Sequence, residues 1–197
     1  MDENDVGAMG MSEKVKTEVV GKGLVHIYFG KGKGKTTAAV GLACRAAGRG
    51  RKVIFCQFMK GSATGEIAAL NKLGVDIIRA PESRGFLFNM DEEQRASYGQ
   101  LQRDLFAQVL DAVSDLPEES AYDLIVLDEV LDILSADFIG TAEIRSLLER
   151  KPVGAELVLT GREAPEWLEE KASYITEMKK AKHPWDEGIA AREGVEY

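Results

Sequence analysis

The stretch "YFGKGKGKTTAAV", residues 28–40, decides the fold of this protein. It joins a short apolar run to an Ala-rich segment through a loop in which glycines and lysines alternate. The generic phosphate-binding loop, GxxxxGK[ST], stands in the same place between a strand and a helix. Gly34, Lys35 and Thr36 match its end, but its first glycine would fall on Phe29. The loop therefore begins one residue later and is shorter than the generic pattern.

The residue types of this loop suit a polyphosphate. Glycines, here Gly30, Gly32 and Gly34, let the backbone curl so that its N–H groups form an anion nest. The start of the following helix adds partial positive charge. We expect Lys35 to meet terminal phosphate oxygens and Thr36 to ligate Mg²⁺. Further charge comes from the rim lysines, Lys31 and Lys33. A flexible glycine turn with solvated lysines is the alternative, and the strand-loop-helix context disfavours it.

The rest of the chain alternates between the two kinds of secondary structure. Short apolar runs rich in β-branched residues predict strands at 24–29, 52–58, 75–80, 122–130, 155–162 and 174–181. Helical patterns lie between them at 36–48, 65–74, 90–115, 141–150 (with Thr141 as N-cap) and 164–173. This alternation predicts an α/β protein with a parallel sheet of about six strands flanked by helices. In such sheets ligands bind beyond the carboxyl ends of the strands.

Composition bounds the classes of partner. The 197 residues suit one compact domain, with residues 1–22 as an arm, disordered or capping a partner subunit, and 23–197 as the catalytic domain. The net charge of −8 disfavours a nucleic-acid partner, which needs clustered Lys and Arg. No apolar run reaches the ~20 residues that span a bilayer, so we expect a cytoplasmic protein without a membrane partner. Cys44 and Cys56 lie in apolar surroundings and are expected to be buried structural thiols.

Two further segments are candidates for the site. "LIVLDE" ends an apolar strand in Asp128 and Glu129, where a carboxylate can hold Mg²⁺ directly or through water. The loop "SRGFLFN" carries Phe86 and Phe88, which either pack the next helix onto the core or line a pocket for a flat apolar ligand. "QFMKG" ends a strand at the same predicted edge, and its Lys60 serves either a ligand or a turn.

Together these segments resemble the P-loop-type ATP:corrinoid adenosyltransferases. The matching pieces, in order, are "GKGKGKTTAA", "VIFCQFMKG", "RGFLFN", "LIVLDE", "LVLTGR" and the tail "KKAKHPWDEGIAAREGVEY". They extend over nearly the whole chain from about residue 24, and the shortened loop and the tail are their specific parts. The resemblance implies a P-loop NTPase fold of the RecA-like type. It also explains the short loop as a family trait.

The resemblance implies an unusual use of ATP. A reduced corrinoid, cob(I)alamin or a related one, attacks the ribose 5′ carbon, the adenosyl group moves to cobalt and triphosphate leaves. Carried over by position, residues 30–37 from Gly30 to Thr37 hold the triphosphate. Thr36 and Glu129 hold Mg²⁺ (or Mn²⁺), with Asp128 as a secondary candidate. The aromatic pair, here Phe86 and Phe88, crowds the lower face of the corrinoid and displaces its axial ligand. The resemblance further implies a homodimer, and a flavoprotein is the electron donor to be expected.

Two other classes share parts of this pattern. A RecA-like hydrolase acting on a macromolecule would use the same loop and acids, although the charge and the short chain disfavour a nucleic-acid motor. A non-enzymatic nucleotide- or corrinoid-binding regulator would need the loop but no turnover. The identity of the phosphorus product separates these readings from adenosyl transfer.

Overall fold

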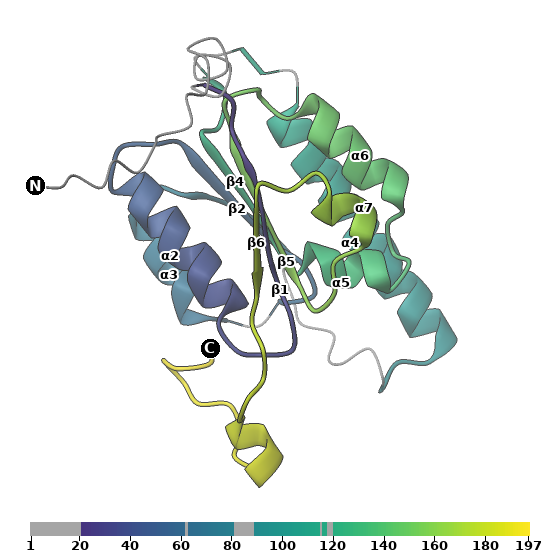
Figure 1. Ribbon diagram of the computed structural model, residues 1–197. Coiled ribbons are helices and arrows are strands. Elements are labelled where there is room, and N and C mark those ends of the chain that lie inside the picture. Colours follow the sequence, from purple (N-terminus) through teal and green to yellow (C-terminus); the bar gives the residue numbers. More distant parts are fainter. Residues whose placement is uncertain (1–20, 62, 81–88, 115, 118–119) are drawn as a thin grey trace, which may run out of the picture.

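The core of the protein is a parallel sheet. The computed structural model describes residues 21–61, 63–80, 89–114, 116–117 and 120–197. Its six strands all run parallel, in the order β3-β2-β4-β5-β1-β6 (Figure 1). Their bounds are β1 (Val25–Phe29), β2 (Val53–Gln57), β3 (Asp76–Arg79), β4 (Leu124–Asp128), β5 (Glu156–Gly161) and β6 (Tyr174–Glu177). The predicted α/β class and the six parallel strands are confirmed.

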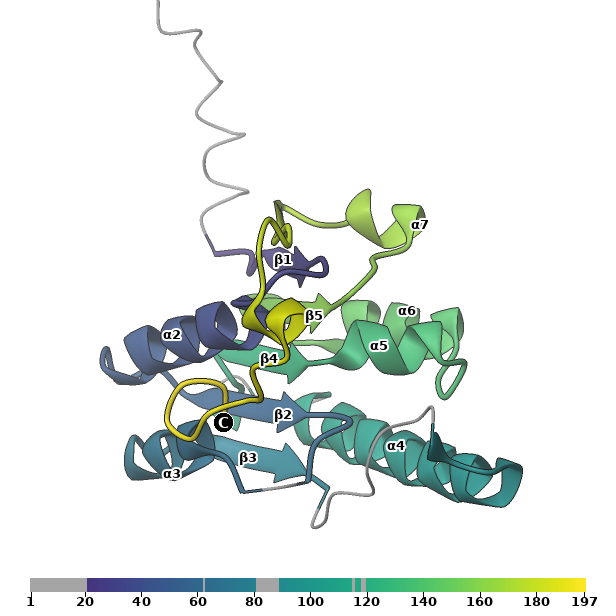
Figure 2. The same cartoon turned by 90° about the horizontal axis from the view of Figure 1, so that it is seen from below.

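Helices cover both faces of this sheet (Figures 1 and 2). The pair α2 (Lys35–Ala47) and α3 (Gly65–Lys72) lies on one face. The other face carries α4 (Glu92–Val113), α5 (Val130–Ser135), α6 (Thr141–Arg150) and α7 (Glu166–Glu169). A 3₁₀ turn, η3 (Pro184–Glu187), lies in the C-terminal tail. Two layers of helices explain why the central strands are continuously apolar, because neither of their faces meets water.

Alternate residues of β2 pack into two separate hydrophobic cores, one on each face of the sheet. In β2, Val53 and Phe55 pack into the core under α2 and α3. The alternate residues Ile54 and Cys56 pack into the larger core on the other face. All five residues of β2 are buried, and so are all five of β4. Both cysteines are free thiols: Cys56 is fully buried, as predicted, whereas Cys44 is only partly buried, contrary to the prediction.

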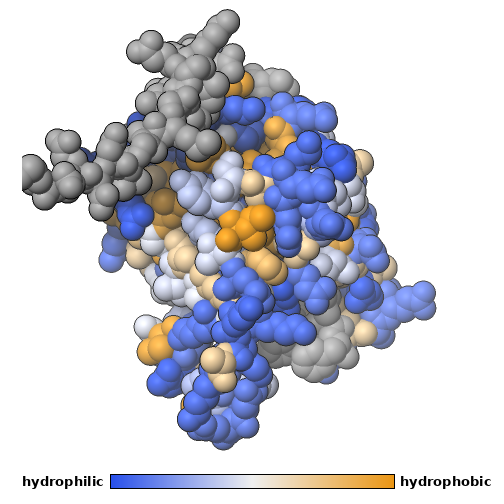
Figure 3. Space-filling model, viewed as in Figure 1, coloured by the Kyte–Doolittle hydropathy of each residue, from blue (hydrophilic) through white to orange (hydrophobic). Residues whose placement is uncertain are grey.

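The β6 edge of the sheet is exposed. All four residues of β6 are exposed, and Tyr174 and Ile175 keep 52% and 47% of their surface in contact with solvent. On the face drawn in Figure 3, small apolar areas are interrupted by hydrophilic surface, which dominates the lower part near the C-terminal tail. The edge strand is thus held on one side only, by β1.

Several predicted boundaries need correction. The last strand was expected over 174–181 but ends at Glu177, because Met178 leaves the sheet to hydrogen-bond the glycine loop. The helix expected over 164–173 is only Glu166–Glu169, which follows Pro165. The N-cap of α6 is Gly140 and not Thr141; the Gly140 N–H donates to the Glu143 carboxylate at 3.0 Å. Helix α5 was not predicted at all.

The predicted N-terminal arm lies almost entirely outside the described residues. Gly21 and Lys22 are its only described members, and the next residue, Gly23, donates its N–H to the Val153 carbonyl at 2.8 Å. No helix in the described ranges is long and apolar enough to cross a membrane.

Candidate active site

The glycine loop connects β1 to α2 at the carboxyl edge of the sheet. Gly30 and Gly34 have φ angles of 112° and 120°, a region that side chains other than glycine's disfavour. A Cβ added to Gly32 would lie 2.6 Å from the Met178 carbonyl oxygen and 2.7 Å from that of Lys179. The loop is therefore shaped both by backbone conformation and by close contact with the chain that leaves β6.

The first turn of α2 is open for an anion. Its N-cap is Gly34, and no side chain of the described chain caps the helix. A helix start leaves its first N–H groups without intrahelical partners, and they carry partial positive charge. Lys35 begins this helix, and its Nζ donates to the carbonyls of Gly30 at 2.7 Å and Gly32 at 2.9 Å. The lysine thereby lies across the loop, at the position where phosphate oxygens would be expected.

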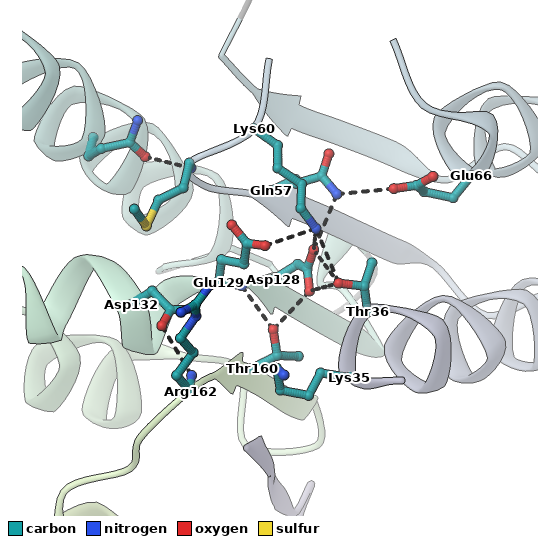
Figure 4. A network of polar contacts seen from close by, with 12 residues as sticks. Lys35, Thr36, Gln57, Lys60, Glu66, Asp128, Glu129, Asp132, Thr160 and Arg162 are labelled. Carbon is teal, nitrogen blue, oxygen red and sulfur yellow. Dashed lines mark hydrogen bonds and ion pairs between the residues drawn. The ribbon is translucent and has the colours of Figure 1, made fainter. Parts of the chain in front are cut away.

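Asp128 is the centre of the polar network (Figure 4). It ends β4 with no exposed surface and accepts a hydrogen bond from Thr36 Oγ1, 2.9 Å from Oδ1. Thr160 Oγ1 donates to the same oxygen at 2.8 Å, and Gln57 Nε2 donates to Oδ2 at 3.2 Å. Lys60 Nζ lies 3.2 Å from Oδ2. A buried carboxylate needs such partners, because desolvating an unpaired charge is costly. The ends of four neighbouring elements are thus joined by one carboxylate.

Glu129 joins the network through Lys60. Its Oε1 lies 3.0 Å from Lys60 Nζ, and its backbone has the left-handed φ of 63° that is uncommon for a residue with a side chain. Its N–H donates to Thr160 Oγ1 at 2.9 Å, which supports this conformation. The bend between β4 and α5 therefore places two successive acids in the same polar network instead of on opposite faces.

Burial and charge shift the ionisation of this cluster. Burial raises the pKa of Glu129, and Lys60 opposes that rise. For Lys60 itself burial lowers the pKa, but the attraction of Asp128 and Glu129 outweighs it, so the net pKa is raised. Burial lowers the pKa of Lys35, and the nearby Asp132 carboxylate opposes the change. Lys60 is accordingly held in its charged form by the two acids.

The sequence did not point to three residues that support the network. Thr160 lies one residue before the end of β5 and hydrogen-bonds both the Asp128 carboxylate and the Glu129 N–H. Asp132, on α5, accepts a hydrogen bond from the Arg162 N–H at 3.1 Å, and burial raises its pKa. Their only sequence signal is position, since "LTGR" ends a strand and α5 follows the acids directly. All polar residues near the carboxyl ends of the predicted strands could have been taken as candidate site residues for this reason.

The C-terminal tail reaches the rim of the loop. Lys33 Nζ lies 2.9 Å from Glu196 Oε1, and Gly32 donates its N–H to the Met178 carbonyl at 2.6 Å. Hydrogen bonds from Arg192 and Lys33 lower the pKa of Glu196 to about 2. The tail matched the family pattern in sequence, but no contact with the loop was predicted from it.

The structure describes most of the predicted site residues, but not all of them. The structure brings Thr36, Asp128 and Glu129 into one network, in which the Thr36 hydroxyl donates to Asp128. Lys35 lies beside it and hydrogen-bonds the loop carbonyls of Gly30 and Gly32. Lys31 and Thr37 lie in the loop and the first turn of α2 as expected. Phe86 and Phe88 lie outside the described residues, so their role stays a prediction.

Comparison with known proteins gives a consistent result. The sequence model described as ATP:corrinoid adenosyltransferase BtuR/CobO/CobP matches residues 21–197. The chain is 35% identical to a corrinoid adenosyltransferase of Sinorhizobium sp, over 96% of this chain and 91% of that protein. It is 31% identical to the corrinoid adenosyltransferase of Escherichia coli (strain K12), over 89% and 86% of the two chains. The one from Pseudomonas aeruginosa is 30% identical over 95% and 90%. This chain belongs to the ATP:corrinoid adenosyltransferase family and is a transferase of the P-loop NTPase-like α/β fold.

Proposed function

We propose that this enzyme moves the 5′-deoxyadenosyl group of ATP to the cobalt of a reduced corrinoid and releases intact triphosphate. The cobalt electron pair forms the new cobalt–carbon bond, the bond between C5′ and its oxygen breaks, and that oxygen leaves with the electrons on triphosphate. The observation that carries the proposal is the uncapped start of α2 beside Lys35, next to the Asp128 network. Such a site would bind the triphosphate that leaves, so that C5′ of the ribose stays accessible to the corrinoid.

The chain's own groups supply charge stabilisation. Negative charge develops on the departing triphosphate, and preorganised donors aimed at that charge lower the barrier. Lys35 and the first N–H groups of α2 are such donors, and Lys31 and Lys33 add positive charge at the rim. No general base is required, because the nucleophile carries its own electron pair. The glycine loop is therefore proposed to act on the leaving group.

A divalent cation fits this site when it is shared with the nucleotide. Thr36 and Asp128 offer the oxygen ligands that Mg²⁺ prefers, and Mg²⁺ commonly uses one or two carboxylates plus substrate phosphates. Among the residues that the structure describes, no group of three or more His, Cys, Asp or Glu could hold a metal without other ligands. We propose that Thr36 with the carboxylates of Asp128 and Glu129 holds Mg²⁺ or Mn²⁺, which would neutralise triphosphate charge.

ATP hydrolysis is the competing activity. A base that activates water needs an acceptor free of a cation, within reach of that water. Both Asp128 and Glu129 are instead paired with Lys60, and a divalent cation bound with ATP would occupy the same carboxylate oxygens. This pairing favours a role in holding charge over a role in proton abstraction.

One experiment separates the two activities. The protein is mixed with MgATP and chemically reduced cobalamin, the corrinoid is followed by its visible spectrum, and the phosphorus product is identified by NMR. We expect ATP consumption that requires the reduced corrinoid, with triphosphate formed in equal amount to adenosylated corrinoid. ADP and phosphate as the stoichiometric products would refute the proposal. The homodimer, the flavoprotein donor and the cytoplasmic location stay predictions, the first of them open to sedimentation analysis.

A further inference from the structure

The Lys60 ammonium lies where the metal ligands converge. Its Nζ is 3.2 Å from Thr36 Oγ1, 3.2 Å from Asp128 Oδ2 and 3.0 Å from Glu129 Oε1 (Figure 4). These side chains are the ones proposed above for the divalent cation. A lysine ammonium has three N–H donors and no acceptor, so it can satisfy three oxygens at once. One cation of the chain therefore occupies the centre of this oxygen set.

We propose that Lys60 is a positioning residue that fills the metal position until the nucleotide arrives, so that the divalent cation enters only together with ATP. This inference rests on the proposed function, because it takes Thr36, Asp128 and Glu129 as the metal's protein ligands. It adds that the free enzyme keeps these ligands assembled and has little affinity for metal alone.

Electrostatics explains why the exchange depends on the nucleotide. An ammonium and a divalent cation within a few ångströms repel each other strongly in a partly buried site. Metal alone must displace a lysine whose Nζ lies 3.2 Å from Asp128 and 3.0 Å from Glu129. ATP brings additional negative charge, which accommodates both the metal and the released ammonium. Metal and nucleotide thus favour each other's binding, and linkage requires the effect to be reciprocal.

The position of Lys60 in the fold permits such a movement. Asp128 belongs to a central strand and is fully buried, whereas the Lys60 side chain keeps 29% of its surface exposed. Lys60 follows the end of β2, and Met59 before it has a left-handed φ of 57°. The long lysine side chain can therefore leave the cluster without disturbing the sheet. A permanent structural ion pair would use the same contacts, so a measurement must separate the two roles.

Manganese binding without corrinoid provides that measurement. Mn²⁺ is titrated into the wild-type protein and followed by electron paramagnetic resonance, first alone and then with ATP. The variants are Lys60→Met, which removes the charge but keeps an apolar stem, and Lys60→Arg, which keeps the charge. Lys72→Met, on the exposed end of α3, is the control for overall charge. Circular dichroism checks that each variant is folded.

The expected pattern is specific. In the wild type ATP tightens Mn²⁺ binding about tenfold or more, whereas Lys60→Met binds Mn²⁺ alone about tenfold more tightly and loses most of this coupling. Lys60→Arg and Lys72→Met behave like the wild type. A Lys60→Met protein that is folded and binds Mn²⁺ alone no better than the wild type would overturn the inference.

The Mn²⁺ titrations of the wild-type protein test the inference even if Lys60→Met does not fold. Tight Mn²⁺ binding by the wild type without ATP, or none with ATP, contradicts the inference by itself. Because no corrinoid is present, these results are independent of adenosyl transfer. A protein that shows the expected metal coupling yet makes ADP would refute the proposed function and leave this inference intact.

Discussion

Two lysines pair with carboxylates beside the glycine loop, and the two pairs differ mainly in burial. Lys60 lies 3.2 Å from Asp128, which has no exposed surface and accepts hydrogen bonds from three further elements. Lys33 lies 2.9 Å from Glu196, an exposed residue of the C-terminal tail. The shorter contact belongs to the weaker pair, because water and salt screen exposed charges. Burial of the carboxylate, and not the N–O distance, therefore ranks these two ion pairs.

The largest expected effect comes from removing the buried carboxylate. Asp128→Ala leaves Lys60, Thr36 and Thr160 without their shared acceptor, and breaking a buried pair in this way costs about 3 kcal/mol of unfolding free energy. Urea denaturation measures the change. The control is Asp111→Ala on the exposed side of α4, expected to stay within about 0.5 kcal/mol of the wild type. Equal, small losses in both variants would remove the distinction between the two regions.

The second effect concerns affinity. Lys35→Ala removes the cation that lies across the loop, and a charged hydrogen bond is worth about 1.5–3 kcal/mol, so ATP affinity should fall about 10- to 100-fold. Isothermal titration of ATP measures it. Stability should change little, since the hydrogen bonds of Lys35 within the described residues go to two carbonyls of the loop itself. Retained tight ATP binding would take the loop out of its assigned role.

The third effect probes the contact between loop and tail. Gly32→Ala would place a Cβ 2.6 Å from the Met178 carbonyl oxygen, so backbone must move, at a cost of about 1–3 kcal/mol. Gly41→Ala is the matched control: it lies inside α2 with no atom within 4 Å of its added Cβ, and should stabilise the protein by about 0.5–1 kcal/mol. Thermal unfolding compares the two. Similar behaviour of both variants would mean that the loop does not press against the tail.

The smallest effect is expected at the exposed pair. Glu196→Gln should lower the unfolding midpoint at neutral pH by less than Asp128→Ala or Gly32→Ala does, because water screens the charges of an exposed pair. The pKa of Glu196 is lowered from 4.5 to about 2, so its contribution is fully present above pH 4.5 and is lost as pH falls through about 2. A carboxyl NMR titration of the wild type checks the direction. A midpoint loss as large as that of Asp128→Ala would reverse the ranking of the two regions.

Part of the fold and of the site could be predicted from the sequence, and part could not. The strand-loop-helix order, the six strands and the grouping of Lys35, Thr36 and Asp128 followed from apolar runs and from the rule that parallel strands share a carboxyl edge. Which of two successive acids faces Thr36 did not follow. That choice depends on the left-handed backbone of Glu129, which tertiary contacts with Thr160 support.

The C-terminal region was the least predictable. Residues 178–181 continue an apolar strand pattern only weakly, and the strand ends because Met178 hydrogen-bonds Phe29 and Gly32 of a distant segment. The short helix α5 is hidden because only Asp128 and Glu129, with no Gly or Pro, separate "VLDILS" from the apolar run of β4. In both places a long-range contact or a backbone reversal decides the structure, and neither has a local pattern.

The most direct test of the account follows one oxygen atom. ATP labelled with oxygen-18 at the bridge between C5′ and the α-phosphate is incubated with the enzyme, Mg²⁺ and reduced cobalamin, and the products are weighed by mass spectrometry. If the loop holds triphosphate as a leaving group, all the label appears in triphosphate and none with the adenosyl group. Label that stays in ADP, with unlabelled phosphate released, would show attack at the terminal phosphate and contradict the account.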